Sequence, residues 1–176
     1  MTTSLCQLKE DMALLQKETA GQITQLKTEV DKLKQQLRVR QVAFSAALLF
    51  PKPTTIGPFN QDTTIIFKHV ITNIGNAYNS NSGIFTAPVR GVYNFEWSVG
   101  AYGDGSHGSG AWLVKNSENV FMALAWQRGC FMSASKAAAL LLEVGDVVFV
   151  SLVKENLAYD NGSRHTTFSG HLLFPM

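Results

Sequence analysis

This sequence has few features of disulfide-rich, nucleic-acid-binding or membrane-spanning proteins. Its 176 residues include only two cysteines, Cys6 and Cys130, which are too few for a disulfide framework and leave the redox compartment undecided. The formal net charge is +2, so no basic surface argues for a nucleic-acid partner. No stretch is long and apolar enough to span a bilayer. What the chain does have is 45% hydrophobic residues, enough for the core of one medium-sized domain with an appendage.

The sequence motifs of enzymes are absent as well. It contains no nucleophile elbow, no zinc-ligand pair and no phosphate loop, so we predict a non-enzymatic protein without catalytic residues. The four histidines, His69, His107, His165 and His171, are scattered. His165 and His171 would share a face of a regular strand, but roughly 20 Å apart, which is too far for one metal ion. A ligand contact stays open for His107, which lies in a glycine-rich stretch.

The N-terminal part of the chain has the composition and period of a coiled coil. Residues 5–37 carry dense charge and no proline, and apolar residues recur at steps of three and four, the spacing of a seam buried between helices. Two successive steps of four around Thr19 and Ile23 indicate a stutter, and Gly21 is a weak point at the same place. We therefore predict that residues 1–41 form a coiled-coil oligomerisation stalk. The predicted seam consists of Leu5, Leu8, Met12, Leu15, Ile23, Leu26, Val30, Leu33 and Leu37.

From Val42 onward charge thins and short apolar segments alternate with glycine- and asparagine-rich turns. Many short strands at fairly even spacing indicate an antiparallel sandwich or jelly roll, so we expect a globular head over residues 42–176. Residues 136–142 are rich in alanine and leucine and would allow a helix, but their length between turns favours a strand. The expected strands cover residues 42–50, 64–67, 91–99, 111–115, 120–127, 135–142, 146–154 and 166–174.

A glycine and three aromatic residues mark the middle of this head. Gly91 opens a stretch in which Tyr93, Phe95 and Trp97 alternate with polar residues, the pattern of a strand with one buried face. Gly91 would permit a close backbone approach or a tight turn. The three aromatic side chains are expected to fill the sandwich. The polar residues between them point the other way, where they would be able to make contacts to a neighbouring subunit.

Phe67, Asn73, Tyr78 and Phe85 precede this stretch at fixed spacings, and residues 167–175 read as the last strand of the same domain. Together with residues 91–97, they resemble the signature of the complement C1q globular domain. The resemblance covers nearly all of residues 42–176. Trp97 stands where the family usually has Phe or Tyr, and His171 stands where Phe is common, a departure expected to alter local packing. The residues expected to carry the family signature and core are Phe67, Asn73, Tyr78, Phe85, Gly91, Tyr93, Phe95, Trp97, Phe168, Gly170 and Phe174.

The resemblance implies an all-β, ten-stranded antiparallel jelly-roll sandwich that forms tight trimers, a fold shared with tumour necrosis factor ligands. The β-branched and leucine residues of the seam mildly favour a coiled coil of two helices. The resemblance of the head implies three chains, so we expect a homotrimer or a higher oligomer. Many relatives carry a collagen stalk, whereas this chain has no Gly-X-Y repeat. The coiled coil would therefore align the chains. Initiation of the complement cascade is not expected without collagen, and the chain looks closer to cerebellin-like and short-chain C1q-like secreted proteins.

Several further sites are expectations from single residues. Asp160 offers a carboxylate for calcium, because some heads of the family bind calcium near the trimer apex, although a plain turn explains the same residues. Asn161 is the acceptor of the only N-glycosylation sequon. Cys6 lies on the outer side of the predicted helix and would be able to link chains or trimers. The sequence indicates no cofactor, apart from this candidate calcium site. The expected ligand-binding loops cover residues 102–110 and 156–164.

These observations favour a secreted, extracellular recognition module that binds a protein receptor, a glycan or a microbial surface multivalently, in the manner of innate immunity. No signal peptide is visible in this chain, and the N-terminus by itself favours a non-secreted product. If the sequence is that of a mature or truncated chain, the missing signal agrees with the secretion that the resemblance implies. One alternative is a signalling ligand that organises receptors, like cerebellins or tumour necrosis factor. A cupin-type enzyme would need a histidine-rich metal cluster, and an intracellular scaffold has only the missing signal in its favour.

Overall fold

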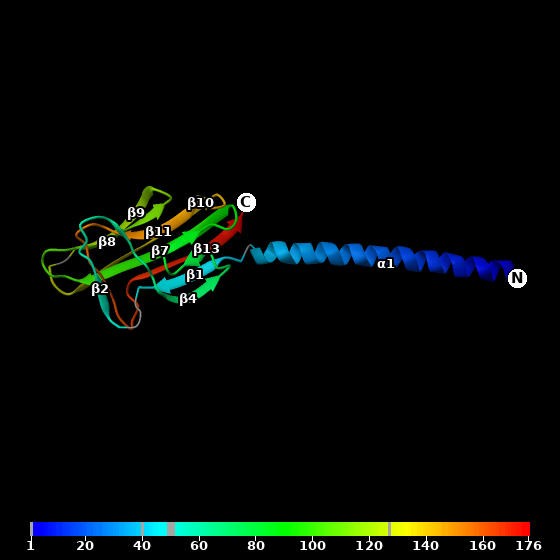
Figure 1. Ribbon diagram of the computed structural model, residues 1–176, viewed down its shortest axis with the longest axis horizontal. Coiled ribbons are helices and arrows are strands. Elements are labelled where there is room, and N and C mark those ends of the chain that lie inside the picture. The colour runs from blue at the N-terminus through cyan, green and yellow to red at the C-terminus, as the bar shows by residue number, and fades with distance from the viewer. Residues whose placement is uncertain (1, 40, 49–51, 127) are drawn as a thin grey trace. The chain divides into compact units, whose positions relative to one another are not determined.

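The computed structural model describes residues 2–39, 41–48, 52–126 and 128–176. The chain divides into two compact units, residues 1–38 and residues 39–176. The first unit is a helix and the second is a β-sandwich, which we call the head (Figure 1).

The N-terminal unit is one continuous helix, α1 (Thr2–Val39). Its 38 residues contain no proline and many good helix formers, so the helix runs through Gly21 without a break. At about 1.5 Å per residue it is about 57 Å long. Every side chain whose exposure the structure describes in this helix is exposed. A helix with apolar residues and no buried face owes little of its stability to packing within its own chain.

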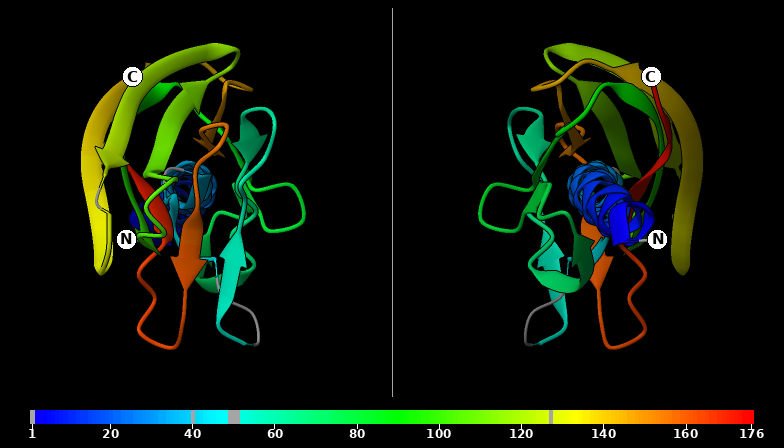
Figure 2. Two further views of the ribbon diagram at one scale, coloured as in Figure 1. Left: turned by 90° about the vertical axis from the view of Figure 1, so that its left-hand side faces the viewer. Right: turned by 90° about the vertical axis from the view of Figure 1, so that its right-hand side faces the viewer.

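The head is a sandwich of antiparallel sheets, so the predicted fold class, a jelly roll after an N-terminal helix, is confirmed (Figures 1 and 2). One sheet has the strand order β10-β7-β13-β1-β4, and the other has the order β5-β6-β11-β8-β9 with β3 also paired to β11. A small third sheet pairs β12 with β2. The strands are β1 (Ala43–Ala47), β2 (Thr54–Ile56), β3 (Thr63–Thr64), β4 (His69–Ile74), β5 (Tyr78–Asn79), β6 (Ile84–Thr86), β7 (Gly91–Tyr102), β8 (Ser109–Lys115), β9 (Glu118–Ala125), β10 (Phe131–Leu142), β11 (Val147–Leu152), β12 (Ala158–Asp160) and β13 (Thr167–Pro175).

Aromatic rings fill the space between the two large sheets. The side chains of Tyr93, Phe95 and Trp97 on β7 are each at most 1% exposed, as their alternation predicted. The ring of Phe44 stacks on Tyr78 with centroids 4.7 Å apart and meets Phe168 edge-on at 4.8 Å. Such pairs add about 0.5–1.5 kcal/mol beyond the area that they bury. The core therefore joins strands from the start, the middle and the end of the head.

Polar atoms of the buried aromatic residues have partners. The Trp97 indole Nε1 donates a hydrogen bond to the Ala111 carbonyl across the sandwich at 3.2 Å. The Tyr93 hydroxyl donates to the Val89 carbonyl at 2.8 Å. Because the indole finds an acceptor on β8, tryptophan fits a position where the family that the sequence resembles usually has Phe or Tyr.

Two glycines permit close contacts in the first sheet. A Cβ atom added to Gly170 would lie 2.6 Å from Cδ1 of Phe95 and 2.8 Å from Cε1 of Phe44. A Cβ atom on Gly91 would lie 2.6 Å from the carbonyl oxygen of Phe174. The close backbone approach expected at Gly91 is therefore present, and it is made by the last strand.

The structure corrects some expectations about single elements. Phe174 is 53% exposed instead of buried, because the pairing of β13 with β7 shifts between Leu172 and Phe174 and turns its ring outward. His171 is exposed too, so the departure there does not disturb the core. The expected strand 64–67 ends at Thr64, and the first strand ends at Ala47; the residues predicted beyond position 48 in that strand lie outside the described part. Residues 136–142 are strand, as predicted.

Candidate assembly and recognition surfaces

The first candidate site is the side of the five-stranded sheet that points away from the core, which we call the outer face. Alternation along β7 buries the odd-numbered residues from 93 to 101 and turns the even-numbered ones outward. The register then aligns outward residues of neighbouring strands in rows. One end of the face carries Val92, Leu141 and Phe174 in such a row, with Leu141 45% exposed. This end is an apolar patch built from three strands.

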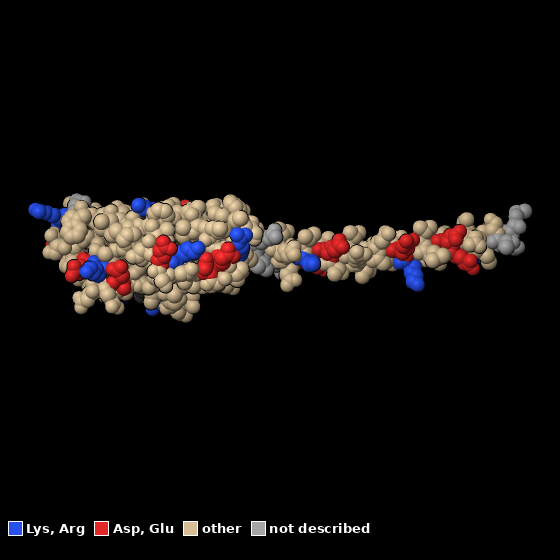
Figure 3. Space-filling view, turned by 90° about the horizontal axis from the view of Figure 1, so that it is seen from above, with Lys and Arg blue, Asp and Glu red and all other residues tan. Residues whose placement is uncertain are grey.

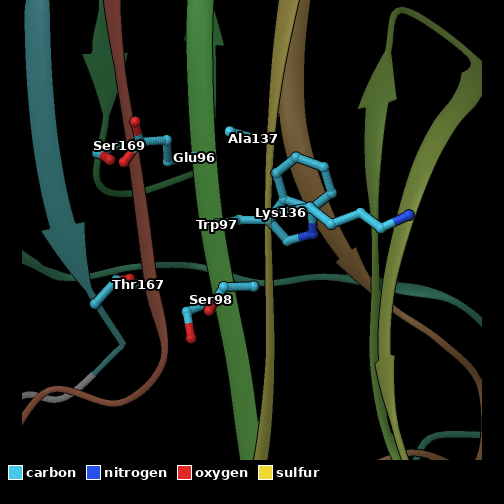
Figure 4. A pocket seen from close by; sticks show the side chains of 8 residues that line it. Glu96, Trp97, Ser98, Lys136, Ala137, Thr167 and Ser169 are labelled. Carbon is cyan, nitrogen blue, oxygen red and sulfur yellow. The ribbon is translucent and has the colours of Figure 1, made fainter.

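The middle of the outer face is lined by small side chains. Here β10 contributes serines and alanines opposite β7, and β13 contributes Thr167 and Ser169. A shallow depression of about 400 Å³ opens at this place (Figure 4). Small residues leave the backbone accessible, so a second surface is able to approach closely. The depression is lined by Glu96, Trp97, Ser98, Ser135, Lys136, Ala137, Thr167 and Ser169.

An aromatic cluster ends the outer face, at the end of β7 opposite to Gly91. The ring of Tyr102 contacts Phe131 with centroids 5.3 Å apart and Tyr159 with centroids 5.1 Å apart. His165 lies against Phe131, with centroids 4.6 Å apart. Tyr102 is 55% exposed. The outer face therefore has apolar side chains at both ends and small polar ones between them. The aromatic cluster is not apparent from the sequence, because its members are far apart in the chain.

The structure brings the two expected ligand-binding segments together beside this cluster. The amide of Leu157 donates to the Gly108 carbonyl at 2.9 Å, and Gly108 bridges to Asn156. In the first segment, Asp104 orders the loop: its Oδ1 accepts from the amides of Ser106 and His107, each at 2.8 Å. Its Oδ2 lies 2.7 Å from Nδ1 of His107, and this side-chain hydrogen bond is the main cause that lowers the pKa of Asp104.

The second segment is less exposed than the sequence suggested. Asn156, Leu157, Ala158 and Asp160 are buried, and the exposed part of the segment is residues 162–164. The Asp160 Oδ1 accepts backbone hydrogen bonds from Asn161 at 3.0 Å and from His165 at 2.7 Å. This carboxylate oxygen therefore stabilises the turn between Asp160 and His165. Within the described residues, no three His, Cys, Asp or Glu side chains gather to hold a metal ion.

The two remaining single-residue candidates lie at the surface. Asn161 is half-buried; its Oδ1 accepts from the Ser163 amide at 2.8 Å and its Nδ2 lies 3.3 Å from the Tyr159 hydroxyl. Cys6 is an exposed, free thiol on α1, and Cys130 is an exposed, free thiol in the turn before β10. The turn position of Cys130 explains its positive φ of 67°.

The predicted seam of α1 is a row of exposed apolar side chains. Its most exposed member is Leu5 at 64%, and its least exposed is Val30 at 45%. Leu14, which lies off the seam, is 66% exposed. Nine large apolar residues on one stripe of one helix make a surface that water solvates poorly.

The sandwich also has an apolar edge next to the outer face. Strand β9 ends the second sheet and lies beside β10, which ends the first. Phe121, Leu124 and Trp126 are exposed there by 45%, 52% and 63%. We call these three residues, together with the exposed Lys136 of β10, the side edge. An exposed edge strand with large apolar residues favours contact with another surface.

Charge is spread thinly over the surface. On the side shown in Figure 3, lysine and arginine are interspersed with aspartate and glutamate, and no large patch carries one sign. The described helix is not long and apolar enough to pass through a membrane.

The C1q domain family model matches residues 43–173. Complement C1q tumor necrosis factor-related protein 3 from human is 37% identical over 116 residues, which is 65% of this chain and 46% of that protein, and the mouse protein gives the same values. One of the polypeptides of the human complement C1q subcomponent is 31% identical over 143 residues, 77% of this chain and 51% of that protein. The chain thus spans about half the length of the curated relatives it matches.

Solved structures agree with this match at the level of the fold. The globular domain of zebrafish complement 1qA superposes with a TM-score of 0.60 at 19% identity, covering 77% of this chain and 99% of that chain. Murine APRIL gives a TM-score of 0.59 at 14% identity, covering 76% and 99%. Because the family model covers nearly the whole head and the head has the same jelly roll, this chain belongs to the C1q domain family.

Proposed function

We propose that this protein is a homotrimeric, non-enzymatic recognition module, in which α1 forms a three-stranded stalk and three heads bind a receptor, glycan or microbial surface together. The observation that carries the proposal is the seam of α1. Each well-buried leucine would contribute on the order of 1.5–3 kcal/mol, and α1 gains this only when chains associate. A helix whose apolar stripe stays exposed in one chain therefore argues for partners of the same kind.

The outer face supports the same assembly in the head. Its ends carry apolar anchors, and its middle carries small residues that let another surface come close. A cyclic trimer needs two different, complementary patches on each chain, because its interfaces are head-to-tail. We assign these two roles to the outer face and the side edge. In this arrangement the side edge of one head packs on the outer face of the next.

Recognition is assigned to the loops at the end of the head that holds the aromatic cluster. Loops on a rigid scaffold are the usual place of binding residues. The loop ordered by Asp104 and residues 162–164 are exposed there. Three copies would convert weak single contacts into strong binding to a multivalent target. The extracellular location that we propose rests on the family alone.

A second candidate function is that of a receptor-organising signalling ligand. The name of one relative, complement C1q tumor necrosis factor-related protein 3, refers to both C1q and tumour necrosis factor. The fold likeness to APRIL, and to the Eiger TNF of S. frugiperda at a TM-score of 0.61, supports a jelly roll of the kind that tumour necrosis factor ligands have. Activation of a cell through a bound receptor, without affinity for glycans or microbial surfaces, would select this candidate.

The experiment that tests the proposal is binding of the full chain to arrays of glycans, microbial surfaces and surface proteins. The wild-type oligomer is compared with a variant whose seam is disrupted by Leu26→Lys and Leu33→Lys. A matched control carries Leu14→Lys and Gln25→Lys, which add the same two charges off the seam. We expect wild type and control to bind one class of target and the seam variant to bind at least about tenfold more weakly, because avidity is lost. Binding that is equal in all three would contradict the multivalent mechanism.

A further inference from the structure

We propose that Lys136 of one subunit forms an ion pair with Glu96 of the next subunit, and that this pair sets the register between the side edge and the outer face. The inference rests on the proposed homotrimer and adds to it the polar contact that aligns neighbouring heads. The occupant of the depression in Figure 4 is thus a second copy of this chain.

Glu96 is the only carboxylate that the described strands place on the outer face. It lies on β7, it is exposed, and its Oε1 accepts a hydrogen bond from Nδ2 of Asn94 at 3.1 Å. No lysine or arginine approaches its carboxylate within 4.0 Å among the described residues. The other titratable groups on this face are the imidazoles of His171 and His69. A single negative charge therefore stands amid small neutral side chains.

Lys136 is the only charged residue of β10, in the sequence FMSASKAAALLL. Its side chain is exposed, and in the described part of the chain no carboxylate pairs with its ammonium. All other residues of this edge strand are apolar or small. A lone lysine on an otherwise uncharged edge that is twelve residues long blunts indiscriminate strand pairing, and it gives the side edge one positive point.

The two charges do not meet within the chain. The register pairs Lys136 with Trp97 and Ala137 with Glu96, so the two side chains leave the sheet on opposite sides. Figure 4 shows the lysine extending from β10 away from Glu96, although both residues line one depression. One unpaired charge on each of two different patches fits a head-to-tail interface, in which two different surfaces of the chain meet.

The pair would act mainly on register and specificity. A charge pair between subunits steers encounter and excludes arrangements that bring like charges together. Removing one partner leaves the other charge unpaired at a surface that is losing its water, which costs more than the pair itself contributes. Wrong registers of the side edge on a smooth face of serines and alanines would otherwise differ little in energy.

The test is a charge swap in the full chain. Three variants are compared with wild type: Glu96→Lys, Lys136→Glu, and the double variant that carries both. Glu118→Lys is the matched control, because Glu118 is exposed at the start of β9 and lies outside the outer face. Sedimentation at decreasing concentration gives the dissociation constant of the oligomer. We expect each single reversal to raise it about tenfold or more, the double variant to recover most of this loss, and the control to match wild type.

A second measurement does not depend on variants that fold. A zero-length carbodiimide cross-linker joins a carboxylate to an amine only when they are in contact. In the wild-type oligomer we expect chains linked to one another, with a peptide that joins Glu96 to Lys136. An oligomeric wild type without this peptide, and with no recovery in the double variant, would overturn the ion pair and leave the homotrimer standing. A monomeric wild type would overturn the homotrimer itself.

Discussion

The side-chain amide of Asn73 forms two hydrogen bonds with the backbone of Tyr78. Its Nδ2 donates to the Tyr78 carbonyl at 2.8 Å, and its Oδ1 accepts from the Tyr78 amide at 3.3 Å. The Tyr78 hydroxyl in turn donates to the Phe67 carbonyl at 3.0 Å. Three residues of the family signature are thus linked in one network, which fixes the turn between β4 and β5 and anchors it to the core.

The network predicts that Asn73→Ala destabilises the head. The substitution removes both hydrogen bonds and leaves backbone groups of a buried residue without their partner, so we expect the free energy of unfolding to fall by about 1–3 kcal/mol. Urea unfolding followed by tryptophan fluorescence measures the change. Asn119→Ala, at an exposed position of β9, is the matched control and should change the free energy little. Equal effects of the two substitutions would contradict this role of Asn73.

Gly170 predicts a second effect on stability. A methyl group there would enter the rings of Phe95 and Phe44 at less than 3 Å, and these rings are held by the rest of the core. We expect Gly170→Ala to cost about 1–3 kcal/mol through overpacking. Gly162→Ala adds the same methyl group where no atom lies within 4 Å, and thermal unfolding should show little change. A Gly170→Ala protein as stable as wild type would mean that the core yields more than this geometry allows.

Alkaline pH should weaken the head through its buried tyrosines. Burial raises the pKa of Tyr78 above its ordinary value of 10.0, and burial also raises the pKa of Tyr93. The folded state therefore keeps protons that the unfolded state releases. Stability is intact below about pH 10 and falls as the pH rises above it, by at most about 1.4 kcal/mol per pH unit for each tyrosine.

The measurement is urea unfolding between pH 8 and about pH 11. Tyr78→Phe should lower stability at neutral pH, because the hydrogen bond to Phe67 is lost, and should make the alkaline decline less steep. If Tyr78→Phe and wild type lose stability equally with pH, burial of the phenol is not the cause.

Calcium is expected to leave the melting temperature of the protein unchanged. The Asp160 side chain is buried and its Oδ1 accepts backbone amides of the same turn, so this oxygen is committed to the fold. Thermal unfolding of the full chain with added calcium and with a chelator measures the effect. A higher melting temperature with calcium that disappears in Asp160→Asn would show that the carboxylate serves a metal site after all.

The sequence predicted best where apolar residues recur with a regular period. The alternation of Tyr93, Phe95 and Trp97 predicted the central strand, and steps of three and four predicted the helix, because each pattern directly reflects which side of an element is apolar. The short strands β2, β4, β5, β6 and β12 were missed. They have two to six residues and no alternation, since their pairing is fixed by the strands beside them rather than by their own composition.

The candidate surfaces were predictable only in part. The polar residues between the aromatics of β7 did indicate an outward face. Phe174 and Tyr102 contribute to this face for reasons that need the register: a bulge turns Phe174 outward, and Tyr102 meets Tyr159 only after the chain has crossed between sheets. The burial of Asp160 was likewise invisible, because a turn sequence does not tell whether its carboxylate faces water or its own backbone.

The mass of this chain in solution tests most directly whether three copies associate. Light scattering coupled to size exclusion, at micromolar concentration, measures this mass independently of shape. We expect three times the 19.3 kDa of one chain, or a multiple of that trimer. A stable, folded species with the mass of a single chain would contradict it.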